Sequence, residues 1–109
     1  MARNELSALL DEIEAMLEEP PRGGVDAVAR VEQTLTDGYA RALALEGERW
    51  RIEQRLAEVA RLVADGGATG VREELAALSA GLERADTSLG RLRNLLASLR
   101  RHADAVRAA

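Results

Sequence analysis

The chain of 109 residues contains no cysteine and no phenylalanine, and only two prolines. Without cysteine, no disulfide, thiolate metal ligand or cysteine nucleophile can form. No stretch approaches the roughly 18 consecutive apolar residues that a membrane-spanning helix needs. Acidic residues follow Leu9 and Leu10 at once, so the N-terminus does not fit a secretory signal peptide. These absences lead us to expect a cytoplasmic protein without membrane association.

Aromatic residues are almost absent, since Tyr39 and Trp50 are the only two. Alanine and leucine supply most of the hydrophobic 47%, a composition typical of long helices. A core of thin helical layers offers no deep concave pocket, so we expect no enzyme activity. All 15 basic residues are arginine, which we interpret as the codon bias of a GC-rich bacterial genome.

The apolar positions form a palindrome around residue 67. In both directions they step by alternating threes and fours, as in the seam of a coiled coil. The residue numbers of each pair add up to 134, and an a-type position always faces a d-type position. This symmetry predicts an antiparallel helical hairpin. The pairs include Val63 with Val71, Leu56 with Leu78, Ile52 with Leu82, Leu45 with Leu89, Ala42 with Leu92, Leu35 with Leu99, and Val28 with Val106.

Side-chain size supports this register, because small residues face large ones across the seam. Gly38 is predicted to lie opposite Leu96, and Arg49 opposite Ala85. Such complementarity is expected of true neighbours, because protein interiors are closely packed. Two hypotheses account for Arg49. It either specifies the register as a polar seam residue, or lays its stem over Ala85 and reaches Asp86 or Glu53, which we favour.

Helix-breaking residues divide the single predicted domain, residues 1–109, into three helices. The first spans about residues 5–18, with Asn4 as its N-cap and Pro20-Pro21 after its end. The second spans about residues 26–64 and stops at Asp65-Gly66-Gly67. The third spans about residues 70–106, with Thr69 as its N-cap. The predicted fold is all-α: a long antiparallel hairpin with a short N-terminal third helix.

The first helix is expected to dock at the open end of the hairpin. It follows a short corner, so it folds back antiparallel to the second helix and parallel to the third. Residues 1–19 carry a net charge of −5 and residues 84–109 a net charge of +4, which favours this placement. Its apolar face is expected to cover Tyr39, Leu43 and Leu95. The expected ionic partners are Arg91, Arg93, Arg100 and Arg101.

No motif in the chain indicates catalysis, a cofactor or a metal. His102 is the only histidine, and we interpret it as a solvated residue near a helix end. Glu-x-x-His, the motif of di-metal helical bundles, does not occur. The glycines near residue 67 lie between two helices rather than after a strand, so they predict a turn and not a phosphate loop. An isoelectric point near 5.1 makes nucleic-acid binding through the arginines of residues 84–107 a weak third hypothesis.

Trp50 is the main candidate for binding a protein partner. It lies beside the seam and beyond the expected reach of the first helix, and tryptophan is enriched at the centres of interfaces. The candidate surface consists of Trp50, Leu43, Ala57 and Tyr39. Because two-fold dimers are the commonest assemblies, we expect a homodimer through this surface. The competing interpretation is that Trp50 lies flat across its own helices.

In size and helical pattern the chain resembles the helical hairpins exported by type VII secretion systems, and also flagellar export chaperones. The first group carries Trp-x-Gly in the turn, whereas the turn here is Asp65-Gly66-Gly67-Ala68-Thr69-Gly70. The leading hypothesis is a non-catalytic adaptor or scaffold that associates with itself. The resemblance implies an alternative, a secretion or export chaperone that holds an amphipathic helix of its client.

Overall fold

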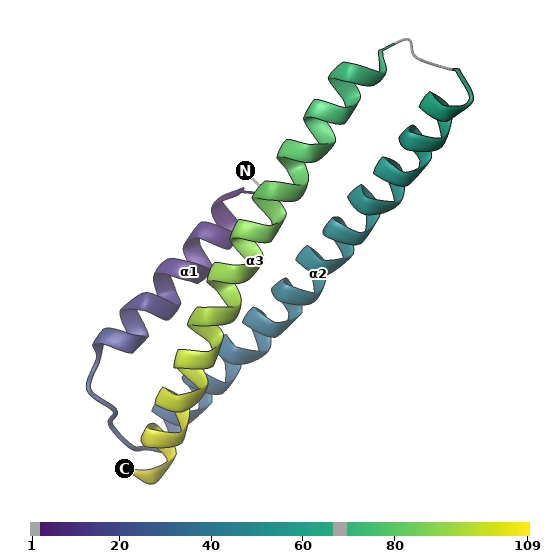
Figure 1. Ribbon diagram of the computed structural model, residues 1–109. Coiled ribbons are helices and arrows are strands. Elements are labelled where there is room, and N and C mark those ends of the chain that lie inside the picture. Colours follow the sequence, from purple (N-terminus) through teal and green to yellow (C-terminus); the bar gives the residue numbers. More distant parts are fainter. Residues whose placement is uncertain (1–2, 67–69) are drawn as a thin grey trace. The chain divides into compact units, whose positions relative to one another are not determined.

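The computed structural model describes residues 3–66 and 70–109, and its regular structure there is entirely helical (Figure 1). Helix α1 spans Arg3–Glu18, α2 spans Val25–Ala64 and α3 spans Val71–Ala108. Helices α2 and α3 form an antiparallel hairpin with the short α1 docked at its open end, which confirms the predicted fold class. Among the residues described, no helix combines the length and apolarity that crossing a membrane requires.

Helices α1 and α2 both end at the helix-breaking residues that the sequence predicts. Helix α1 ends at Glu18, shortly before Pro20, because a residue that precedes proline is pushed out of the α region. Gly66 follows α2 with φ of 89°, and its N–H donates to the carbonyl of Val63 at 3.1 Å, as in a helix C-cap. The N-cap prediction for Asn4 is wrong, because α1 already begins at Arg3. Gly67 and Thr69 lie outside the described residues.

The chain divides into two compact units, of which the first comprises Met1–Leu43 and Gly90–Ala109. Here the first part of α2, the last part of α3 and α1 pack together. Gly38 lies against Leu96, as the register predicts: a Cβ atom added at Gly38 would be 2.3 Å from Leu96 Cδ2. The core of this unit consists of Leu10, Ile13, Met16, Val31, Leu35, Ala42, Leu92, Leu96, Leu99, Ala103 and Val106.

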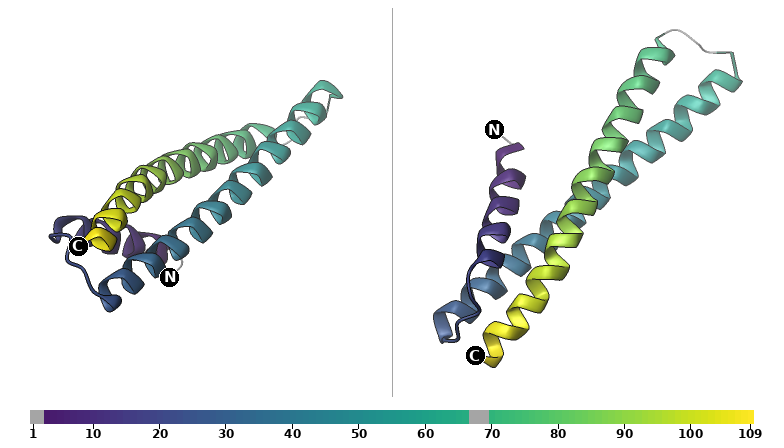
Figure 2. Two further views of the ribbon diagram at one scale, coloured as in Figure 1. Left: turned by 90° about the horizontal axis from the view of Figure 1, so that it is seen from below. Right: turned by 60° about the vertical axis from the view of Figure 1, so that its left-hand side comes forward.

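Polar contacts fix the direction of α1 within this unit. Glu19 pairs with Arg30 and Glu12 contacts Thr34, so α1 runs antiparallel to α2. Glu14 pairs with Arg91 of α3 at 2.8 Å, which confirms the predicted pairing of acidic α1 with this arginine. Figure 2 shows the end of α3 beside the linker that joins α1 to α2, where the backbone of Gly23 lies against Ala109.

The second unit, Ala44–Leu89, contains the remaining parts of α2 and α3. Its helices keep the predicted register, since Ile52 packs at Gly81. Two helices share a single seam, so most seam side chains of this unit are only half-buried. Val63 is even 47% exposed, although it lines the same shallow surface recess as Val71, as their predicted pairing requires. The buried residues are Leu45, Val59, Ala85 and Leu89.

Candidate interaction surface

Helix α1 occupies one flank of the seam in the first unit, the flank that contains Thr34. The Thr34 side chain is buried, and its hydroxyl lies 3.0 Å from the carbonyl of Arg30 and 3.3 Å from a carboxylate oxygen of Glu12. Arg30 donates to both carboxylate oxygens of Glu19. The buried Thr34 hydroxyl thereby has the partners that burial requires, whereas the Arg30–Glu19 pair lies at the surface.

Tyr39 and Leu43 lie on the other flank of α2 and stay exposed. Five residues separate Thr34 from Tyr39, about 140° around an α-helix, so one docked helix cannot cover both. Tyr39 is 47% and Leu43 69% exposed. The prediction that α1 covers these two side chains is wrong, while Leu95 is half-buried. The contacts of α1 with Thr34, Arg30 and Arg91 lie on the Thr34 flank instead.

Trp50 is the largest exposed apolar side chain of the second unit. It is 61% exposed, and Ala57 and Ala60, on the same side of α2, are exposed as well. Residues seven apart differ by only about 20° around a helix, so Trp50 and Ala57 share one face. The structure thus brings these two candidate residues together in this unit. Tyr39 and Leu43 belong to the first unit.

An ion pair borders the Trp50 side of α2. The Nε atom of Arg49 lies 3.0 Å from Asp86 and 3.9 Å from Glu53, which confirms the interpretation that Arg49 reaches these two carboxylates. The short contact is an ion pair without hydrogen-bond geometry at Nε. The Arg49 side chain as a whole stays partly exposed.

A second ionic group ties α2 to α3 on the opposite flank of the second unit. Arg55 donates to Glu58 at 2.9 Å and to Glu74 at 2.6 Å. The hydrogen bond to Glu58, followed by the charge of Glu74, raises the pKa of Arg55 above its usual value. The side chain is permanently charged in any case. We therefore assign Arg55 to the alignment of the two helices, not to proton transfer.

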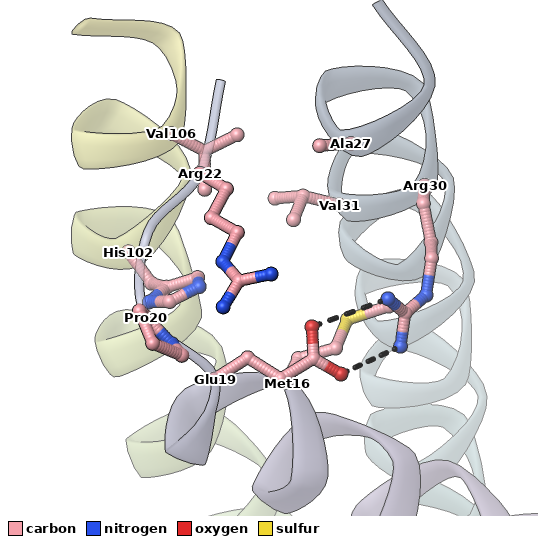
Figure 3. Close-up of a pocket in the computed structure, with 9 residues that line it drawn as sticks. All are labelled: Met16, Glu19, Pro20, Arg22, Ala27, Arg30, Val31, His102 and Val106. Carbon is pink, nitrogen blue, oxygen red and sulfur yellow. Dashed lines mark hydrogen bonds and ion pairs between the residues drawn. The ribbon is translucent and has the colours of Figure 1, made fainter. Parts of the chain in front are cut away.

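His102 lines a recess of about 290 Å³ in the first unit (Figure 3). Arg22 reaches from the linker into the space between His102 and Val31, and the Glu19–Arg30 pair lies at its edge. His102 is half-buried and borders this open recess near the end of α3. The residues that line the recess include no hydroxyl or thiol group.

Two further observations bear on the chemistry of the surface. Among residues 3–66 and 70–109, no group of three or more acidic or histidine side chains is placed to hold a metal ion. Arg91 pairs with Glu14, and Arg107 pairs with Glu32 and Asp104. These intramolecular pairs reduce the positive charge that the arginines of α3 present to a nucleic acid.

Comparisons with known proteins give no relatives: no family model, no curated protein and no solved structure matches this chain.

The surface also has exposed apolar residues that the sequence pattern did not single out, namely Val25 at 85% and Leu62 at 48% exposure. Both residues lie outside the three-four alternation of the seam, and this departure from the pattern indicates that their side chains are exposed.

Proposed function

We propose that the chain is a non-catalytic helical interaction protein that binds a second copy of itself through α2. The main support for this proposal is the 61% exposure of Trp50. Tryptophan dominates the energy of many interfaces, because its large ring excludes water at low cost in conformational entropy. Ala57 and Ala60 on the same side of the helix are small, so they allow another helix to approach closely.

The energy available from this side chain is sufficient to matter. Aromatic side chains bury about 150–250 Å² each, so covering the exposed part of one Trp50 removes roughly 100–150 Å² from water. At about 25 cal/mol per Å² this contributes about 3 kcal/mol per copy. A two-fold dimer gains this contribution twice, and it is opposed by the lost freedom of the two molecules.

The test compares two alanine substitutions in the second unit. Trp50→Ala is expected to weaken association by about tenfold or more in sedimentation equilibrium, with the helical circular dichroism unchanged. Leu62→Ala is the matched control, because Leu62 is also exposed but lies about 120° away around α2. It is expected to leave association unchanged.

Two results would contradict this proposal. The first is a monomeric protein at high micromolar concentration. The second is an equal effect of Trp50→Ala and Leu62→Ala on association, which would indicate non-specific contact between apolar surfaces rather than a defined interface.

A further inference from the structure

The exposed side of α2 around Trp50 has a second palindrome, distinct from that of the seam. It is centred between Glu53 and Gln54 and lies entirely within the second unit. At equal distances from this centre, Trp50 pairs with Ala57 and Glu46 pairs with Arg61. A large residue thus corresponds to a small one, and an acidic residue to a basic one.

These paired residues point to the same side of the helix. Relative to Trp50, Ala57 and Arg61 are rotated by about 20° and Glu46 by about 40°. Trp50, Ala57 and Arg61 are exposed, and Glu46 is half-buried. We call these four residues the Trp50 face. Along the helix axis, Glu46 and Arg61 are about 22 Å apart, which is long enough for two α-helices to pack side by side.

We propose that two copies associate through the Trp50 face with their α2 helices antiparallel, about a two-fold axis that passes by Glu53 and Gln54. The proposal rests on the proposed function and adds the register. Each indole then lies over Ala57 of the second copy, and each Glu46 faces Arg61 of the second copy. Such an interface is self-complementary, as a two-fold interface requires.

A parallel arrangement fits the same face badly. It sets Glu46 against Glu46 and Arg61 against Arg61, and like charges in contact oppose association. It also places the two Trp50 rings against each other and leaves Ala57 opposite Ala57, so bulky and small layers no longer interlock. In the antiparallel register the two copies of Gln54 lie close to the axis, and Glu53 of each copy stays near Arg49 of its own chain.

Charge reversal tests the Glu46–Arg61 pairing. Arg61→Glu alone creates two like-charge pairs per antiparallel dimer and is expected to weaken association by about tenfold. Glu46→Arg has the same effect on the interface. Mixing the two variants restores both pairs, so the mixture is expected to associate nearly as tightly as the original chain. Arg72→Glu, at an exposed position on α3, is the control and leaves association unchanged.

Glu46 also has an interaction within its own chain, so circular dichroism of the Glu46→Arg variant accompanies the measurement. The effect of Arg61→Glu is independent of that interaction at residue 46. If Arg61→Glu associates as tightly as the original chain, or if the mixture associates no better than the single variants, the register is wrong.

Single cysteines in this cysteine-free chain provide the second test. Gln54→Cys is expected to form an intermolecular disulfide on oxidation, because residue 54 lies at the axis. Arg61→Cys is expected to form none, because the two copies of residue 61 are then separated by about 22 Å along the helices. Efficient crosslinking at residue 61 would overturn the antiparallel register while leaving self-association intact. Absence of any dimer in sedimentation equilibrium would instead refute the proposed function.

Discussion

Because Leu96 packs closely on Gly38, we expect Gly38→Ala to destabilise the protein, although helix propensity alone predicts that this substitution stabilises it. Gly38 lies in the interior of α2, where replacement by alanine ordinarily stabilises a helix by up to about 1 kcal/mol. Here the added Cβ would lie 2.3 Å from Leu96 Cδ2 and 3.3 Å from its Cγ. Leu96 is only 3% exposed, so its side chain has little free space into which it can move.

The magnitude follows from these two opposing effects. Overpacking of a well-filled core costs about 1–3 kcal/mol, and the propensity gain offsets at most about 1 kcal/mol of this cost. Gly38→Ala is therefore expected to lower the free energy of unfolding by up to about 2 kcal/mol. Gly90→Ala is the matched control, because a Cβ atom at that helical position meets no atom within 4 Å. It is expected to raise the free energy of unfolding by about 1 kcal/mol.

Urea denaturation followed by circular dichroism measures both changes. All variants are compared at one protein concentration, because self-association adds to apparent stability. The two alanine variants are expected to differ by about 1–3 kcal/mol, with Gly38→Ala the less stable. Equal stabilisation by both substitutions would refute the close contact between Gly38 and Leu96, and with it this layer of the register.

Two further predictions concern α1 and the second unit. Ile13 is fully buried, so Ile13→Ala is expected to lower the free energy of unfolding by about 2–5 kcal/mol in urea denaturation. Glu18→Ala, on the exposed side of α1, is the control and is expected to change it by less than about 0.5 kcal/mol. An equally small effect of Ile13→Ala would show that α1 is not docked. A variant with both Leu56→Cys and Leu78→Cys is expected to form an intramolecular disulfide in dilute oxidised protein, seen as faster migration on a non-reducing gel, and crosslinks that form only between molecules would contradict the hairpin.

The antiparallel register could be predicted from the sequence because a helix converts spacing into direction. Apolar residues that alternate by threes and fours must share one face, and the symmetric order around residue 67 left one way to pair them. The Gly38–Leu96 contact and the 3.0 Å approach of Arg49 to Asp86 agree with this register. Pro20 and Gly66 set helix ends by local backbone sterics, which need no tertiary information.

Burial in the second unit was not predictable from the same pattern. The spacing identifies Val63 as a seam residue but does not state how many helices surround it. In the three-helix unit the seam residues from Val31 to Ala42 are buried, whereas in the two-helix unit Val63 remains 47% exposed. The amount of buried surface depends on the number of neighbouring elements, and that number is a property of the tertiary structure.

The sequence by itself determined the three helices, the C-terminal ends of α1 and α2, and the pairing of α2 with α3, since each depends on residues along one chain and their helical periodicity. Only the tertiary structure decided which flank of that pair α1 covers. Both flanks offer α1 a surface, and the apolar residues Tyr39 and Leu43 suggested the one that stays exposed. Helix α1 lies instead where Thr34, Arg30 and Arg91 satisfy its carboxylates. Spacing along one helix fixes which residues share a face, but the flank that a third helix covers depends on contacts between elements far apart in the sequence.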